Sequence, residues 1–280
     1  MRLPPDFETA WTLSFLGARA IPGLELVDNL RYGRVVTLGD SLHWFEGRFA
    51  EADLTHGTTP AAPRSGSRQM ARWLFDLDAD LEPFREMARR DRILAPLVRR
   101  RPGLRRPLLL DPFEATVRAI IGQLVSVAAA STLLTRLVQT FGTVLTSRRG
   151  PALAFPSAAD LEAAGHRRLA RLGLPRGKAN ALVAVAERCR RGDLDWADLR
   201  GDAALADRVL RRIPGIGPWT SGYVRWRGLG DPDAFLDADL GIIKALEARR
   251  LARRDIGRRT DRWRPWRGFA IAHLWAALAE

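Results

Sequence analysis

A short stretch rich in glycine and proline constrains the fold of this chain more than any other feature. Its sequence is Pro214-Gly215-Ile216-Gly217-Pro218, and it separates two segments with helical periodicity. Glycine allows a positive φ and a close approach of another molecule to the backbone, and proline suits the first position of a helix. We therefore predict a tight turn between two short helices, a hairpin spanning residues 203–229.

The second helix of this hairpin would begin with N–H groups that have no carbonyl partner within the helix. They lie at the positive end of the helix dipole and suit a phosphate group. Backbone contacts of this kind bind nucleic acid without selecting a sequence. The residues predicted to bind DNA phosphate are Pro214, Gly215, Ile216, Gly217 and Thr220. An ordinary turn without a ligand is the alternative for this stretch alone.

Residues 228–244 add a second pattern. Gly228, Gly230 and Pro232 are followed by Asp239 at the start of another helical segment. The hairpin and this pattern, in this order and spacing, resemble the signature of the helix-hairpin-helix Gly/Pro-Asp DNA glycosylase superfamily. The resemblance implies that Asp239 is the catalytic carboxylate. Asp237 is the alternative on composition alone, because either aspartate can cap the next helix, and both could be caps only.

An acidic residue suits the reaction that this resemblance implies. An N-glycosidic bond breaks through a cation-like sugar, and a nearby carboxylate stabilises that charge and can orient or deprotonate water. In superfamily members that also cut the strand, a lysine in the hairpin helix attacks the sugar. Trp219 stands at the matching position, and neither Lys178 nor Lys244 does. The resemblance therefore implies a monofunctional enzyme that releases a free base and leaves an abasic site.

The first 95 residues have a mixed pattern. Residues 8–20 have helical periodicity, and runs near 24–32, 35–38 and 42–49 alternate as antiparallel strands do, with turn signals at Tyr32-Gly33 and Gly39-Asp40. This layout, and the motif at residues 11–20 in particular, resembles the N-terminal domain of the 3-methyladenine DNA glycosylase II family, the alkylation-repair branch of the superfamily. By this resemblance Phe15 lies at the edge of the base pocket.

The segment that starts at Asp111 has a capping residue followed by proline, and its helix should end near Gly122. The next residues, Gln123 and Leu124, resemble the wedge of the same family, which enters the duplex where a nucleotide has been flipped out. Leucine suits this role because it replaces lost base stacking and hinders return of the base. Without the matching neighbours, a leucine buried between helices is the alternative.

Aromatic side chains are expected to bind the base. By resemblance Trp219, Tyr223 and Trp275 line the base pocket together with Phe15, and electron-rich rings attract a cationic alkylated base by about 1–2 kcal/mol per good contact. Such a base is already an activated leaving group. The family then implies 3-methyladenine and 7-methylguanine as substrates. Ala276 stands where the family has a second aromatic residue, so deaminated or oxidised bases are alternative substrates.

The net charge of +13 favours a polyanionic partner. Arginines concentrate in two windows, residues 85–106 and 249–267, each with nine arginines against two acidic residues. Some of them can equally be solvated helix faces. We expect double-stranded DNA as the partner, with enzymes that process abasic sites acting downstream. A non-catalytic helix-hairpin-helix DNA binder is the alternative from a different functional class.

Cofactor and compartment follow from what the sequence contains. The single cysteine, Cys189, excludes an internal disulfide and an iron–sulfur cluster, which needs four thiolates. No cofactor is required, but the resemblance allows a Na⁺ or K⁺ ion at the backbone carbonyls near Ile213 and Ile216.

The sequence has neither a signal-peptide core nor an apolar run of roughly 20 residues, the length that spans a bilayer. We expect a cytoplasmic monomer, nucleoid-associated in a bacterium, with no membrane partner.

These patterns together predict an α+β protein that is mostly α. A small N-terminal domain with an antiparallel sheet would occupy residues 1–95, and a helical glycosylase domain residues 96–280. The helical domain would consist of two all-helical subdomains, with Asp239 in a central cleft. Residues 131–186 have helical periodicity, with breaks at residues 141–142, 148–151, 155–156 and 172–175. Lys178, at the start of one of these helices, is a further candidate for a phosphate contact.

Overall fold

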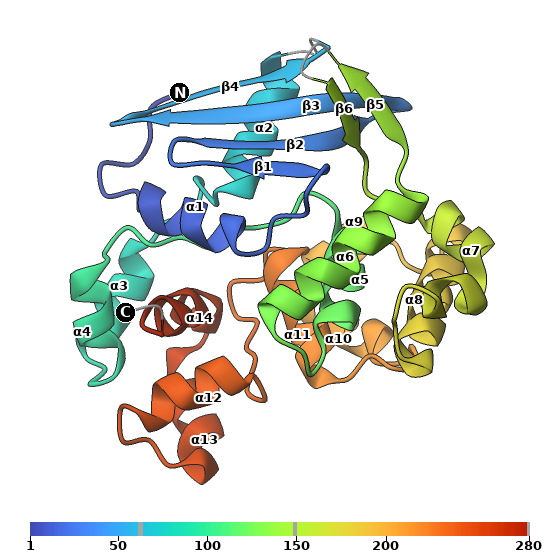
Figure 1. Cartoon of the computed structure of the whole chain (residues 1–280). Helices are drawn as coiled ribbons and strands as arrows, with labels where there is room; N and C mark the ends of the chain where they lie inside the picture. Colours follow the sequence, from blue (N-terminus) through green and yellow to red (C-terminus); the bar gives the residue numbers. More distant parts are fainter. Residues whose placement is uncertain (61–63, 148–149, 279–280) are drawn as a thin grey trace.

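The computed structural model describes residues 1–60, 64–147 and 150–278. A four-stranded antiparallel sheet forms one end of the molecule (Figure 1). Its strands follow the chain order: β1 (Glu25–Val27), β2 (Arg31–Leu38), β3 (Ser41–Ala50) and β4 (Asp53–Thr59). Helix α1 (Thr9–Gly17) precedes the sheet and α2 (Arg64–Leu74) follows it. The predicted antiparallel sheet near the N-terminus is confirmed.

Two details of the sheet differ from the prediction. Tyr32 and Gly33 do not form a turn but lie inside β2. Gly33 provides space, because a Cβ there would lie 2.4 Å from the Trp44 ring. The chain reverses earlier, where the Asp28 carboxylate accepts a hydrogen bond of 3.0 Å from the N–H of Leu30. Strand β4 was not predicted, since its polar sequence lacks regular apolar alternation.

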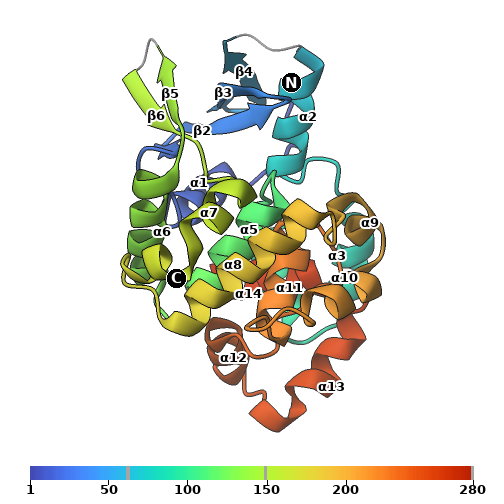
Figure 2. The same ribbon diagram turned by 90° about the vertical axis from the view of Figure 1, so that its right-hand side faces the viewer.

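The rest of the chain is mostly helical and forms two groups on one side of the sheet (Figures 1 and 2). One group contains α5 (Pro112–Gly122), α6 (Val127–Phe141), α7 (Ala158–Ala170), α8 (Arg176–Arg191), α9 (Trp196–Gly201), α10 (Ala203–Leu210) and α11 (Pro218–Arg227). The other contains α3 (Glu82–Arg89), α4 (Leu94–Arg100), α12 (Leu240–Glu247), α13 (Ile256–Thr260) and α14 (Arg267–Ala276), with short 3₁₀ turns at Arg253–Asp255 and Asp261–Trp263. The predicted mostly-α class is confirmed. In the part of the chain that the structure describes, no helix is long and apolar enough to cross a bilayer.

A β-hairpin lies between the helix breaks predicted at residues 141–142 and 155–156, in a subdomain predicted to be all-helical. Strands β5 (Val144–Ser147) and β6 (Gly150–Leu153) pair with each other between α6 and α7. The N–H of Leu153 donates to the carbonyl of Gly23 at 2.9 Å, which joins this hairpin to the loop before β1. The description of this region as all-helical is therefore wrong here, because contacts with the distant N-terminal unit stabilise extended backbone.

Two buried hydrophobic clusters form the core. The first joins the sheet and α1–α4 to the C-terminal helices, with members such as Phe45, Leu246 and Phe269. The second fills the space among α5–α11 and includes Val35 and Trp44 from the sheet. Both clusters contain residues on each side of the predicted boundary after residue 95, so the sheet unit and the helical part share their cores.

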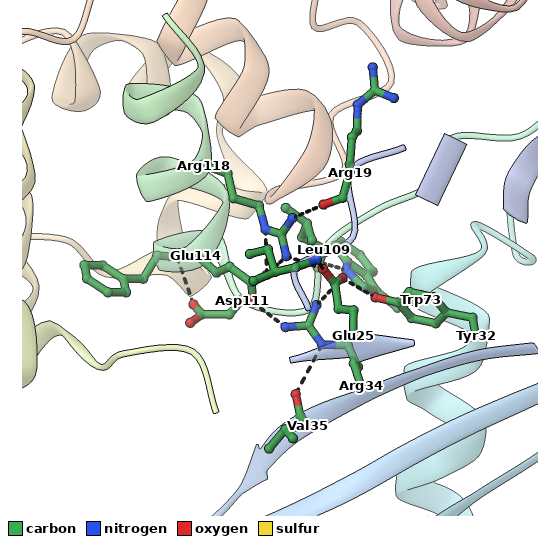
Figure 3. Close-up of polar contacts among 12 residues, drawn as sticks. Arg19, Glu25, Tyr32, Arg34, Val35, Trp73, Leu109, Asp111, Glu114 and Arg118 are labelled. Atoms are coloured by element: carbon green, nitrogen blue, oxygen red, sulfur yellow. Dashed lines mark hydrogen bonds and ion pairs between the residues drawn. The ribbon is translucent and has the colours of Figure 1, made fainter. Parts of the chain in front are cut away.

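Four buried charged side chains join the sheet to α5 (Figure 3). Arg34 of β2 forms an ion pair with Glu114 of α5. Arg118 contacts two acidic residues, Glu25 Oε2 at 2.7 Å and Glu114 Oε1 at 2.8 Å. Removing one partner of a buried pair typically costs about 3–5 kcal/mol, because the other charge is left uncompensated. The cluster therefore fixes α5, and the turn at its C-terminal end, relative to the sheet.

Candidate active site

The predicted hairpin is formed by α10 and α11, and its two glycines act differently. Gly215 has a φ of +88°, and a Cβ there would lie 2.8 Å from the Cβ of Ala181 in α8. Only glycine fits both conditions. Gly217 has an extended conformation, with φ −93° and ψ −176°, so the expected positive φ holds for Gly215 alone. A Cβ on Gly217 would meet no described atom within 4 Å, so the backbone is open to an approaching molecule.

The start of α11 has free donors, as the phosphate prediction requires. Gly217 is the N-cap residue and provides no side-chain hydrogen bond to the helix, and Pro218 follows at the first position. Helix starts of this kind suit anions. Two of the residues predicted to bind phosphate, Ile216 and Thr220, have fewer free donors than expected. The N–H of Ile216 already donates to the Ile213 carbonyl at 3.0 Å, and the Thr220 side chain is buried. Thr220 is thus limited to its main-chain N–H.

Asp239 is the N-cap of α12 and accepts three hydrogen bonds. Its Oδ1 accepts from the N–H of Ile242 at 2.9 Å and from the indole of Trp275 at 3.1 Å. Its Oδ2 accepts from the indole of Trp219 at 3.0 Å. Asp237 is exposed and has no hydrogen bond or ion pair with any described residue. Asp239 does cap a helix, but the two indoles also tie it to α11 and α14, which a capping role alone does not require.

The four residues predicted to bind the base form one aromatic cluster with this carboxylate. Trp219 and Tyr223 stack with ring centroids 5.5 Å apart, and Phe15 and Trp275 stack at 5.9 Å. Trp219, Tyr223 and Trp275 are half-buried, whereas Phe15 is only 6% exposed. The structure thus brings together side chains from α1, α11 and α14. Phe15 is the buried member of the cluster and stacks on Trp275.

Two arginines in this cluster were not predicted. The Arg19 guanidinium lies 3.8 Å from the centroid of the Phe15 ring and 5.5 Å from that of Trp275. Burial lowers the pKa of Arg19 to about 10, so the group remains charged at neutral pH. Arg227 donates to the Tyr223 hydroxyl at 3.3 Å. Burial alone would raise the Tyr223 pKa, but Arg227 and Arg19 outweigh it and lower the pKa.

The sequence did contain a signal for Arg19. It belongs to the motif at residues 11–20 and follows Phe15 by four positions, the spacing of side chains on one face of the predicted helix, although α1 ends at Gly17. Arg118 holds the backbone of Arg19 in place, because the Nη1 of Arg118 donates to the Arg19 carbonyl at 3.0 Å (Figure 3). The buried charge cluster is thereby linked to the aromatic cluster.

The predicted wedge lies in the turn between α5 and α6. Leu124 is 100% exposed and has a φ of +56°, which is unusual for leucine. Ser126 caps α6 by accepting a 3.2 Å hydrogen bond from the N–H of Ala129. Gln123 is less free than a wedge residue would need to be, because its side-chain amide donates to Gly215 O at 2.9 Å. Of the two, only Leu124 has a free side chain, and the buried-leucine alternative is wrong.

The side chain of Lys178, predicted as a phosphate contact, instead binds main-chain carbonyls of the same chain. Its ammonium group donates to the carbonyls of Ile121 at 2.8 Å and Gln123 at 2.7 Å. The charge is thus directed at the C-terminal end of α5.

Family comparison agrees with this geometry. Residues 117–267 match the family described as "HhH-GPD superfamily base excision DNA repair protein". The chain belongs to the HhH-GPD superfamily. Residues 1–111 match the "AlkA N-terminal domain" family. The resemblance inferred from the hairpin and Asp239 is confirmed.

Named HhH-GPD relatives cover nearly the whole chain. DNA-3-methyladenine glycosylase 2 of Escherichia coli K12 is 34% identical over 277 residues, which cover 97% of this chain and 94% of that protein. The "probable bifunctional transcriptional activator/DNA repair enzyme AlkA" of Mycobacterium tuberculosis is 35% identical over 99% of this chain, which spans 56% of that longer protein.

Solved structures share the fold. A 3-methyladenine DNA glycosylase from Archaeoglobus fulgidus has a TM-score of 0.85 at 21% identity and covers 98% of this chain and 96% of its own. An 8-oxoguanine glycosylase/lyase from Clostridium acetobutylicum, solved in complex with double-stranded DNA, has a TM-score of 0.78 at 18% identity and covers 98% and 92%. At these identities the likeness concerns the HhH-GPD fold only.

Some arginines of the two windows stabilise the fold of this HhH-GPD chain. Several of their arginines are paired with acidic side chains of the same chain, including Arg85, Arg101, Arg106, Arg259 and Arg267. Arg105 instead donates to main-chain carbonyls. Other arginines of both windows are exposed on the surface, among them Arg92, Arg99, Arg253, Arg254 and Arg262. The windows therefore contribute less to a DNA-binding face than their composition suggested.

Proposed function

We propose that this protein is a monofunctional DNA glycosylase that flips alkylated bases, of the 3-methyladenine and 7-methylguanine type, out of duplex DNA and removes them with water. The observation that carries this proposal is the hydrogen bonding of Asp239 to both Trp219 and Trp275. It fixes a carboxylate beside aromatic rings that can stack on a flipped base.

The carboxylate acts on the sugar in this mechanism. As the N-glycosidic bond breaks, positive charge develops at the anomeric carbon, and a fixed carboxylate stabilises it without reorganisation. Asp239 can also orient the attacking water or accept its proton. The open backbone at Gly217 would bind a phosphate of the same strand, and Leu124 would fill the gap left by the flipped nucleotide.

A lysine nucleophile is missing from this arrangement. Trp219 stands where strand-cutting relatives of the fold have their lysine, and its indole is bonded to Asp239. The chain's two lysines lie elsewhere: Lys178 donates to carbonyls at the end of α5, and Lys244 is exposed on α12. This supports hydrolysis rather than a Schiff-base route.

A monovalent cation would fit the hairpin. The carbonyls of Ile213 and Ile216 are neutral oxygen ligands. Among the described residues, Ile213 O accepts a hydrogen bond only from the N–H of Ile216, which leaves a second lone pair. Gly215 O is engaged by Gln123. A bound Na⁺ or K⁺ would add positive charge beside the phosphate.

We also propose that the enzyme acts as a cytoplasmic monomer and that its abasic product is consumed by a strand-cleaving repair enzyme.

Release of bases from methylated DNA tests the proposal directly. Duplex DNA treated with a methylating agent is incubated with the purified protein, and released bases are separated by chromatography. We expect 3-methyladenine and 7-methylguanine, together with intact strands that break only on alkali treatment. A protein–DNA adduct trapped by borohydride would contradict the monofunctional mechanism. Release of hypoxanthine or oxidised bases alone would favour a different substrate class, and binding without any release would favour a DNA sensor.

A further inference from the structure

The turn that carries Leu124 has two features that are unfavourable by themselves. An apolar side chain is fully exposed to water, and a leucine has a positive φ of 56°. A left-handed conformation is strained for a residue with a Cβ. The neighbouring valines, Val125 and Val127, are also 40% and 42% exposed. The surrounding contacts must therefore hold this turn in place.

Four hydrogen bonds hold the turn from two sides. On one side, the ammonium group of Lys178 bridges the carbonyls of Ile121 and Gln123. On the other, the side-chain amide of Gln123 donates to Gly215 O at 2.9 Å and to Thr220 Oγ1 at 2.8 Å. The residue directly before Leu124 thus connects α8 to the phosphate-binding hairpin.

The position of Lys178 makes it the central element of this arrangement. A cation at the C-terminal end of α5 is favoured by the helix dipole, and charge-assisted hydrogen bonds are stronger than neutral ones. Within the described ranges Lys178 has no carboxylate partner. Its helix, α8, also contacts the hairpin, where Ala181 faces Gly215. One helix therefore supports both the wedge turn and the hairpin.

We propose that Lys178 is a positioning residue for the wedge: by holding the Ile121 and Gln123 carbonyls, it directs Leu124 into the duplex in register with the hairpin. This inference rests on the proposed function, since it concerns the flipping step. It predicts that Lys178 matters when a base pair must be opened and is dispensable when the base is already unpaired.

Single-turnover base release separates these cases. Lys178→Met keeps the aliphatic part of the side chain and removes the hydrogen-bond donors. Lys244→Met is the control, because it makes the same charge change at the chain's only other lysine, which is exposed. On duplex DNA we expect Lys178→Met to be roughly 10- to 100-fold slower, as Leu124→Ala should be, and Lys244→Met to be unchanged. On the same lesion in single-stranded DNA, the loss for Lys178→Met should be about threefold at most.

Further variants distinguish positioning from other roles. Lys178→Arg, which keeps charge and donors, should recover most of the duplex rate. The double variant Leu124→Ala with Lys178→Met should be no slower than Leu124→Ala alone, because both changes remove the same step. An equal loss on duplex and single strand, as a destabilised fold would give, or no loss on either, would overturn the inference.

Salt dependence tests the rival role of a direct phosphate contact. Loss of one such contact lowers the slope of log Kd against log salt by about 0.9. We expect no change of slope for Lys178→Met, and a lowered slope would contradict positioning.

Fluorescence of 2-aminopurine beside the lesion reports flipping without chemistry. If the parent protein flips the base but releases none, the proposed function fails while the effect of Lys178→Met on flipping still decides the inference.

Discussion

The indole nitrogen of Trp219 lies 3.0 Å from Oδ2 of Asp239, although the two residues come from different helices and are 20 positions apart. The ring of the same tryptophan stacks on Tyr223. In the proposed mechanism, a base that stacks on this ring would therefore act directly on the carboxylate. Base binding and stabilisation of the sugar cation would then be coupled through one side chain.

Asp239→Asn should strongly slow base release while the protein stays folded. Asparagine caps a helix as well as aspartate does, so α12 should be retained. Loss of the negative charge should slow base release by roughly 100- to 1,000-fold, as does loss of other fixed electrostatic groups. The rate is measured under single turnover and DNA binding by fluorescence anisotropy. Asp237→Asn is the matched control, and an equal loss in that variant would contradict the assignment.

Trp275→Phe should keep the ring and remove one donor to Asp239. The carboxylate is then held by Ile242 and Trp219 only, and we expect kcat to fall by about tenfold with little change in DNA affinity. Trp266→Phe is the control, because the Trp266 indole donates to no described residue. If both variants keep the parent rate, the indole bond does not orient the carboxylate.

Arg19→Gln should shift the balance between cationic and neutral substrates. The Arg19 guanidinium lies 5.5 Å from the centroid of the half-buried Trp275 ring, where it would repel a positively charged base bound on that ring. We expect kcat/KM for 7-methylguanine relative to hypoxanthine to rise by about threefold or more. Arg254→Gln, on an exposed surface, serves as control. An unchanged ratio would show that Arg19 leaves the base site before binding.

Glu25 should make the stability depend on acidic pH. Burial alone would raise the pKa of Glu25, but Arg118 and Arg34 outweigh it and lower the pKa to about 2. Because the folded value lies below the ordinary value of 4.5, the stabilisation is complete above about pH 4.5 and is lost as pH falls toward 2.

Denaturant unfolding between pH 2.5 and 7 measures this effect. Glu25→Gln should lower the unfolding free energy at pH 7 by about 3–5 kcal/mol, because Arg118 loses a buried partner. The same variant should flatten the acid dependence, whereas Glu247→Gln, an exposed control, should not. Parallel curves for the parent and Glu25→Gln would contradict this role.

The sequence by itself determined the features that depend on neighbouring residues. A proline after a glycine starts α11, Asp111 and Asp239 cap their helices, and the hairpin and the aspartate follow in the order of the superfamily. These features could be predicted because turn conformation and capping need only a few consecutive residues. The family assignment and the mostly-α class follow from them.

Only the tertiary structure decided which distant groups meet. The indole of Trp275 reaches Asp239 across 36 positions, Arg19 covers Phe15, and Lys178 supports the wedge turn instead of facing solvent. The β5–β6 hairpin likewise depends on contacts with the N-terminal unit. No local period encodes such pairs, because their energy comes from hydrogen bonds and burial that exist only once the helices have packed.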